Sequence, residues 1–220
     1  MKKEDFMQKL DVVAADQIET LKIMESDKFW EMDENSIFCI ACHLNNKERS
    51  QDILALFCIA ESKNFSFAGA RLRGVQYMRG DALLELGKYD EAIIVYNNII
   101  SFDPSHVAYN NLALALWNNK EFADALKNYI MSISLNERDP FSLRGAGEIL
   151  NRLKRPEEAI PYLVAAVNIN PNYLLALRAL GLAYFNSGYW EGAHRTFNRV
   201  LSLDPDDEIA TNGLAMLDKG

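Results

Sequence analysis

The amino-acid sequence predicts an all-α protein in which antiparallel helix pairs stack into a right-handed superhelical solenoid. Small residues recur at a nearly constant spacing, at Ala92, Ala125, Ala159 and Ala193, separated by 33, 34 and 34 positions. No segment shows the alternation of β-branched and polar residues, bounded by turn signals, that is typical of strands. Self-similarity at this period indicates stacked helical hairpins.

A second small residue precedes each of these alanines by 12 positions. These residues are Gly80, Ala113, Gly147 and Gly181. A large residue follows each alanine by four positions, at Tyr96, Tyr129, Leu163 and Phe197. Two helices approach most closely where both carry small side chains, and large side chains then fill the flanks. Each unit is therefore predicted to be a hairpin that closes on its small residues.

Prolines support the same division. Three units end in a proline, at Pro104, Pro171 and Pro205, because the ring cannot continue a helix. The second unit carries Glu137 at that point, and Asp139-Pro140 then predicts a helix N-cap followed by a proline in the first turn.

The third unit carries two further prolines. Pro156 is expected at a helix start, with Glu157 and Glu158 placed favourably at the positive end of the helix dipole. Pro161 falls five residues later, and we expect it to kink this helix or to delay its start by a turn.

This pattern resembles the tetratricopeptide repeat, which has small residues at positions 8 and 20, large residues at 17 and 24, and proline at 32. On that numbering the repeats cover 73–105, 106–139, 140–173 and 174–207. In this family the first helix of each hairpin (the A helix) lines a concave groove, and the second (the B helix) lies outside it. The resemblance implies a protein that binds a partner segment in this groove.

Two regions flank the repeats. Residues 1–70 are predicted to form a helical N-terminal segment with a degenerate repeat, and residues 71–220 to form the array. Within the first region we expect helices at 5–25, 36–46 and 49–62. A capping helix is predicted over 206–219, with Ile209, Leu214 and Leu217 covering the last hairpin.

The charge balance limits the classes of partner. The 220 residues carry 31 acidic and 23 basic side chains, a net charge of −8. A partner with a phosphate backbone requires clustered positive charge, so we expect no nucleic acid. The sequence has no apolar run long enough to insert into a membrane and no export signal, and its three cysteines favour a reducing compartment. We therefore expect a cytoplasmic protein.

Cys39, Cys42 and His43 form C-x-x-C-H, the spacing by which c-type cytochromes attach haem. That attachment follows export, and the motif lies in an apolar helical run where both cysteines fit as small core residues. A zinc site that recruits Cys58 lacks the usual paired spacing. We expect no cofactor and no metal, and a haem- or metal-carrying protein is the alternative from another class.

We also expect no enzyme activity. His106 and His194 belong to separate units, and the sequence contains no glycine-rich phosphate loop and no nucleophile elbow. Carboxylates such as Glu91 lie at expected helix starts, where they complement the helix dipole.

The resemblance implies which side chains face the groove, namely those at repeat positions 2, 5, 9, 12 and 13. The partner-binding residues predicted in this way are Tyr77, Asp81, Asn110, Leu114, Trp117, Phe141, Arg144, Glu148, Arg152, Arg178, Leu182 and Phe185. The same positions also hold Leu84, Glu85, Val107, Asn118, Asn151, Leu175 and Asn186.

Four of these residues are the strongest candidates. Trp117 and Phe185 are expected to anchor the partner, because large aromatic residues are typical binding hot spots. Packing of these rings against a neighbouring helix is the alternative. Arg144 and Arg178 lie 34 positions apart and are expected to project in register toward a carboxylate.

One branch of the family is not expected. Co-chaperones of this type hold a C-terminal carboxylate with basic and asparagine residues at five groove positions. Those positions here hold Tyr77, Asp81, Asn111, Phe141 and Gly145, of which only Asn111 matches. An adaptor or assembly factor is favoured. The second reading is a secretion chaperone similar to the type III translocator chaperones, and self-association through the N-terminal helix is compatible with both.

Arg79 occupies a position of the first repeat that is apolar in the next unit. A buried polar group requires a partner. We expect Arg79 to pair with an acidic residue of the N-terminal segment, and Glu61 is the candidate.

Overall fold

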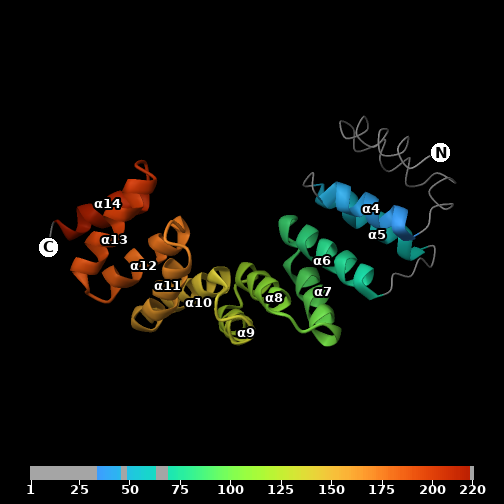
Figure 1. The fold of residues 1–220 in the computed structure, drawn as a ribbon, viewed down its shortest axis with the longest axis horizontal. Helices are drawn as coiled ribbons and strands as arrows, with labels where there is room; N and C mark the ends of the chain where they lie inside the picture. Colours follow the sequence, from blue (N-terminus) through green and yellow to red (C-terminus); the bar gives the residue numbers. More distant parts are fainter. Residues whose placement is uncertain (1–33, 46–48, 63–68, 219–220) are drawn as a thin grey trace. The chain divides into compact units, whose positions relative to one another are not determined.

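The computed structural model describes residues 34–45, 49–62 and 69–218, and the regular structure in these ranges is entirely α-helical (Figure 1). The predicted fold class is confirmed: consecutive helices pair into hairpins, and hairpins stack on one another. The chain divides into two compact units, residues 1–104 and 105–220. The helix expected at 5–25 lies outside the described residues, and the boundary near residue 70 stays a prediction.

The first unit contains the helices α4 (Glu34–Asn45), α5 (Ser50–Ser62), α6 (Gly69–Glu85) and α7 (Tyr89–Phe102). Ile37, Leu44, Leu56 and Val75 lie in its core, where α4 and α5 pack together and α4 packs against α6. α6 begins four residues before the expected Arg73. The repeat numbering marks where the hairpin contact begins, and the preceding Ala-Arg-Leu residues are good helix formers that extend the helix backward.

The second unit consists of three hairpins and a final helix. Its A helices are α8 (His106–Asn118), α10 (Pro140–Arg152) and α12 (Leu174–Asn186), and their B helices are α9 (Phe122–Leu135), α11 (Pro156–Ile169) and α13 (Trp190–Leu203). α14 (Glu208–Leu217) follows α13 and takes the place of a fourth A helix. Each A helix also contacts the next A helix, from α8 through α10 and α12 to α14. The A helices therefore form one continuous side of this unit.

The recurring small residues close the hairpins as the sequence predicts. A Cβ atom added to Gly80 would lie 2.6 Å from the Tyr96 ring, and one added to Gly181 would lie 2.5 Å from Phe197. In these two hairpins the large residue of the B helix therefore occupies the space that the missing side chain leaves. Because such interiors are close-packed, the glycine is required for the two helices to approach this far.

A second set of glycines was not predicted. Gly145 contacts Tyr129 of the preceding hairpin, and Gly213 contacts Phe197 in the same way. The ring of Phe197 is fully buried between Gly181 of its own hairpin and Gly213 of the next helix. These glycines set the spacing between hairpins, whereas Gly181 sets the spacing within one.

The start of α10 has the predicted capping residue. Asp139 accepts hydrogen bonds from the backbone amides of Phe141 and Ser142, and Pro140 lies in the first turn of α10. α11 begins at Pro156 as expected, so the delayed start is wrong, and a kink at Pro161 stays a prediction. Pro161 is solvent-exposed, and water can therefore reach the carbonyl that loses its amide donor.

The capping helix forms, but one of its predicted contacts is wrong. Leu214 and Leu217 pack against the last hairpin as expected, whereas Ile209 is exposed. Ala210 and Gly213 are the residues buried in its place. Small residues are required there because Phe197 occupies the interface.

Candidate partner-binding site

Exposed apolar residues recur along the A helices of the second unit. Position 2 is held by Val107, Phe141, Leu175 and Ile209, one on each of α8, α10, α12 and α14. They are 43%, 58%, 45% and 45% exposed. A core residue at a fixed repeat position would be buried in every unit, so this row is not part of the core.

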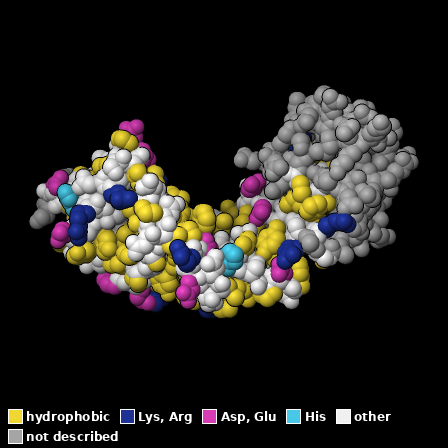
Figure 2. Space-filling model, viewed as in Figure 1, with side chains coloured by type: hydrophobic (Ala, Val, Ile, Leu, Met, Phe, Trp, Pro, Cys, Tyr) yellow, Lys and Arg dark blue, Asp and Glu magenta, His cyan; other side chains and the backbone are white. Residues whose placement is uncertain are grey.

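A second row lies seven residues further along each helix, which is two turns or about 10 Å. Its members are Leu114, Glu148, Leu182 and Met216. The three apolar members are all exposed, and Glu148 is half-buried. We call the exposed side that carries both rows the A-helix face. Figure 2 shows hydrophobic side chains on the surface of this unit, interspersed with charged ones.

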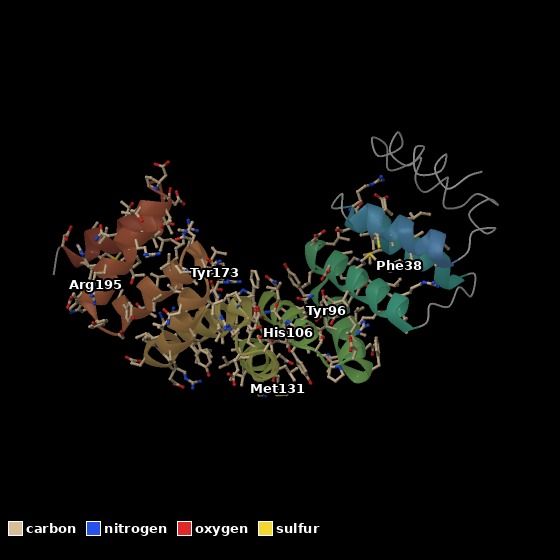
Figure 3. The ribbon with its side chains drawn as sticks, viewed as in Figure 1. Phe38, Tyr96, His106, Met131, Tyr173 and Arg195 are labelled. Carbon is tan, nitrogen blue, oxygen red and sulfur yellow. The ribbon has the colours of Figure 1, made fainter. Side chains whose placement is uncertain are left out.

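Position 5, between the rows, joins each A helix to the next. The Asn110 side-chain amide donates to the Ser142 hydroxyl at 2.7 Å, and Nε of Arg144 donates to the Tyr173 hydroxyl at 2.7 Å. Tyr173 lies where the chain enters α12 (Figure 3). Arg178 donates to Asp207, which precedes α14. These bonds hold the spacing of the A helices, and hence of the two rows.

Both predicted clamp arginines already have acidic partners. Arg144 donates to Glu148 at 2.5 Å, and Arg178 pairs with Asp207 and, at 3.0 Å, with Asp204. Burial by itself lowers the pKa of the Arg144 guanidinium, but Glu148 and Tyr173 outweigh it and raise that pKa. A partner's carboxylate would have to compete with these groups, and the clamp stays a prediction.

Trp117 and Phe185 are half-buried and take part in ring contacts. The Trp117 ring meets Phe122 edge to face at 5.3 Å, and Phe185 meets Trp190 in the same way at 5.5 Å. Both contacts join position 12 of an A helix to position 17 of its own B helix. The guanidinium of Arg152 also lies 4.7 Å from the Phe122 ring centre. In the structure both rings therefore pack against a neighbouring helix, which was the alternative to partner binding. Their role as anchors for a partner stays a prediction.

Tyr77 and Asp81 lie on α6, in the other compact unit. Asp81 accepts a hydrogen bond from the Tyr96 hydroxyl at 2.6 Å. Burial raises the pKa of Asp81, opposed by this hydrogen bond and supported by the nearby Glu85. Tyr77 is half-buried. The other ten predicted residues lie on α8, α10 and α12, the A helices of the second unit, and their role in binding stays a prediction.

Two residues of the apolar rows were not predicted as partner-binding. Ile209 was assigned to the cap, and Met216 was not considered. Adding the repeat length of 34 to Leu175 and Leu182 gives both positions. The signal is therefore in the sequence, but it is recognised only when α14 is treated as an A helix.

The structure does not test the haem or metal alternative. The side chains of Cys39, His43 and Cys58 lie outside the described residues, as does that of Glu61, the expected partner of Arg79. Among the side chains that are described, no three histidine, cysteine or acidic residues lie close enough together to hold a metal ion. None of the described helices has the length and apolarity needed to cross a lipid bilayer.

Family models of the tetratricopeptide repeat match residues 74–106, 110–173 and 150–217. The chain belongs to the tetratricopeptide repeat family. The matched ranges overlap all four repeats predicted from the small residues.

Similar proteins agree with this assignment. The chain is 29% identical over 173 residues to tetratricopeptide repeat protein 13 of Homo sapiens, an alignment that covers 74% of this chain and 20% of that protein. Its structure is similar to the crystal structure of YrrB, described as a TPR protein with an unusual peptide-binding site. The TM-score is 0.67 at 19% identity, covering 89% of this chain and 97% of the other.

A third similar structure is the first TPR of Spaghetti (RPAP3) bound to the HSP90 peptide SRMEEVD. The TM-score is 0.51 at 23% identity, covering 52% of this chain and 91% of the other. At these identities the likeness to both solved structures shows the fold. The chain spans between 20% and 30% of the length of the first curated relatives that it matches.

Proposed function

We propose that this chain is a non-enzymatic, cytoplasmic adaptor or assembly factor that binds a segment of a partner protein on the A-helix face. The observation that carries the proposal is the pair of rows, whose apolar members are exposed on successive A helices at a constant interval. Exposed apolar residues that line up in this way are typical of interaction sites, because isolated surface residues would not share one face. Its odd number of cysteines fits a reducing compartment.

The chemistry of the face favours an apolar segment. Each A helix offers two apolar contacts about 10 Å apart, except α10, where Glu148 replaces the second. A partner that crosses the helices would place one apolar side chain at each. Binding of peptides by the similar structures is compatible with this mode, since both are described with a peptide-binding site or a bound peptide.

The test uses two exposed residues, of which Phe141 also meets the Tyr173 ring edge to face at 5.7 Å. Phe141→Ser combined with Leu175→Ser removes two exposed side chains of the first row, which are 58% and 45% exposed. Trp117 and Phe185 are less suitable, because their rings also hold B helices in place. A partner captured from the native cell is identified by mass spectrometry and purified, and its affinity for each variant is then measured by calorimetry.

We expect the double variant to bind at least about tenfold more weakly, as for the loss of an interface hot spot. The matched control is Ile130→Ser combined with Leu203→Ser, two residues of similar exposure on the B helices α9 and α13. Circular dichroism confirms that both proteins are folded. Equal affinity of the double variant and the wild type would exclude the A-helix face as the binding site.

A further inference from the structure

A cleft of about 310 Å³ lies on the B-helix side of the second unit, among α11, α12 and α13. Its apolar wall includes Val164 and Val167 from α11 and Leu177, Leu180 and Tyr184 from α12. Thr196, Arg195 and Arg199 of α13 also line it. The cleft is thus formed by the B helices of two successive repeats, α11 and α13, and by the A helix α12 that lies between them in the chain.

The cleft and the A-helix face use opposite sides of α12. Leu175 and Leu182 carry the apolar rows, whereas Leu177 and Tyr184 line the cleft. Two residues along an α-helix correspond to a rotation of about 200°. A ligand in the cleft therefore does not compete with a partner on the A-helix face.

The apolar part of the cleft is preformed. Leu177 and Leu180 are 2% and 5% exposed, so their positions are fixed by the core. The rings of Tyr184 and Tyr189 meet edge to face at 5.1 Å. Gly192 leaves room for the Tyr189 ring against α13, since a Cβ there would overlap that ring. A volume at the lower end of the range for ligand pockets fits one or two side chains.

Two arginines one helical turn apart line the cleft on α13. Nε and Nη2 of Arg199 donate to the Pro171 carbonyl at 3.3 and 3.0 Å, which fixes this guanidinium. Arg195 extends outward from α13 (Figure 3), and its contacts within the described residues are long: 3.4 Å to the Tyr189 hydroxyl and 3.8 Å to Glu191. Both arginines are exposed, so each guanidinium is accessible to an anionic group.

We propose that this cleft is a second binding site, which takes an acidic peptide segment whose large apolar side chain lies beside a carboxylate. The apolar side chain would occupy the space over Leu177 and Leu180, and the carboxylate would accept hydrogen bonds from Arg195 and Arg199. Charge complementarity supports an acidic ligand, because the exposed Arg195 and Arg199 lie beside the apolar part of the cleft.

The proposal is tested with two peptides on the full chain. The acidic probe is Ac-EDLFDE-NH2, and the uncharged control is Ac-QNLFNQ-NH2. Amide resonances in a ¹⁵N-labelled protein are followed during titration. We expect the acidic peptide to shift the amides of Gly192 and Thr196 saturably, and to leave those of Leu175 and Leu182 unchanged. The uncharged peptide should bind at least about threefold more weakly.

Three variants decide the assignment. Arg195→Gln combined with Arg199→Gln should weaken binding of the acidic peptide about threefold to tenfold. Asn168→Trp, at an exposed position of the lining, should block the cleft sterically. Leu182→Ser on the A-helix face should bind the peptide as the wild type does.

The proposal is overturned by equal affinity for the two peptides, by unchanged affinity of the arginine double variant, or by shifts that map to the A-helix face. It also fails if neither peptide saturates the cleft at millimolar concentration. The result is independent of the adaptor proposal, since Phe141→Ser/Leu175→Ser tests the opposite side of the unit. Each proposal can therefore fail while the other stands.

Discussion

Asp81 is a half-buried carboxyl group whose ionisation opposes folding. It lies next to Gly80 on α6, where the absent side chain lets Tyr96 approach and donate its hydroxyl proton. Burial raises the pKa of Asp81, and the Tyr96 hydrogen bond compensates only in part. A carboxyl group with a raised folded-state pKa stabilises the fold most below its unfolded pKa of about 3.9, and that contribution is lost as the pH rises through the folded pKa.

We predict that Asp81→Asn is more stable than the wild type at pH 7, with a smaller difference at pH 4. The asparagine Oδ1 still accepts the Tyr96 hydrogen bond, and no charge remains to be buried. Urea unfolding at both pH values measures the difference. The exposed Asp206→Asn is the control for the same substitution at the surface. A lower stability of Asp81→Asn at pH 7 would show that the ionised carboxylate is required.

The sequence predicts the position of this residue but not its environment. Repeat spacing places Asp81 at position 9, which is a groove position in the family, and Leu114 and Leu182 at the same position are indeed exposed. Asp81 is half-buried because its own repeat carries Tyr96 at position 24, where a hydroxyl can reach back to α6. That hydrogen bond joins residues of two different helices, α6 and α7. The repeat spacing assigns a position to each residue but does not predict that the two side chains interact.

At the scale of the element, α14 depends on the residue that caps it. Asp207 is 3% exposed; one of its carboxylate oxygens accepts from the Ala210 amide at 2.8 Å, and the other accepts from Arg178. The same carboxylate therefore starts the last helix and ties it to α12. Loss of an N-cap alone costs about 1 kcal/mol, and loss of a charged hydrogen bond adds about 1.5 kcal/mol or more.

We predict that Asp207→Ala lowers the free energy of unfolding by about 1–3 kcal/mol. Asp207→Asn keeps an oxygen for the Ala210 amide and should recover part of this loss. Urea unfolding monitored by circular dichroism gives both values, and Arg178→Ala completes a double-mutant cycle. A zero coupling energy between the two sites would mean that the cap acts without the arginine.

At the scale of the whole molecule, the sequence predicts the contacts that recur in every repeat. It does not predict features that depend on the local surroundings of a single residue. Every hairpin must close on its own small residues, so Gly147 and Gly181 appear at one interval and fix the fold. The exposure of Ile209 follows from the same interval, but only when α14 is counted as an A helix. The start of α11 before Pro161 depends on solvent access, which no periodic pattern records.

A chain built from repeats of this kind has contacts mainly between neighbours. Within the second unit each helix packs against the next one or two, and the first unit has a separate core on α4, α5 and α6. Stability in such arrays is approximately a sum of repeat and interface terms. Damage in one unit is therefore expected to stay local.

We predict that Phe197→Ala destabilises the last helices of the second unit and leaves the first unit unchanged. The ring is fully buried against Gly181 and Gly213, so its loss should cost about 3–5 kcal/mol. Because those contacts lie within α12, α13 and α14, amide hydrogen exchange should accelerate there while α5 and α6 keep their protection. Phe102→Ala removes a ring that is 49% exposed on α7 and should change neither region. Equal acceleration in both units would instead require that the chain unfolds as one cooperative body, because only global opening exposes α5 and α12 to the same extent.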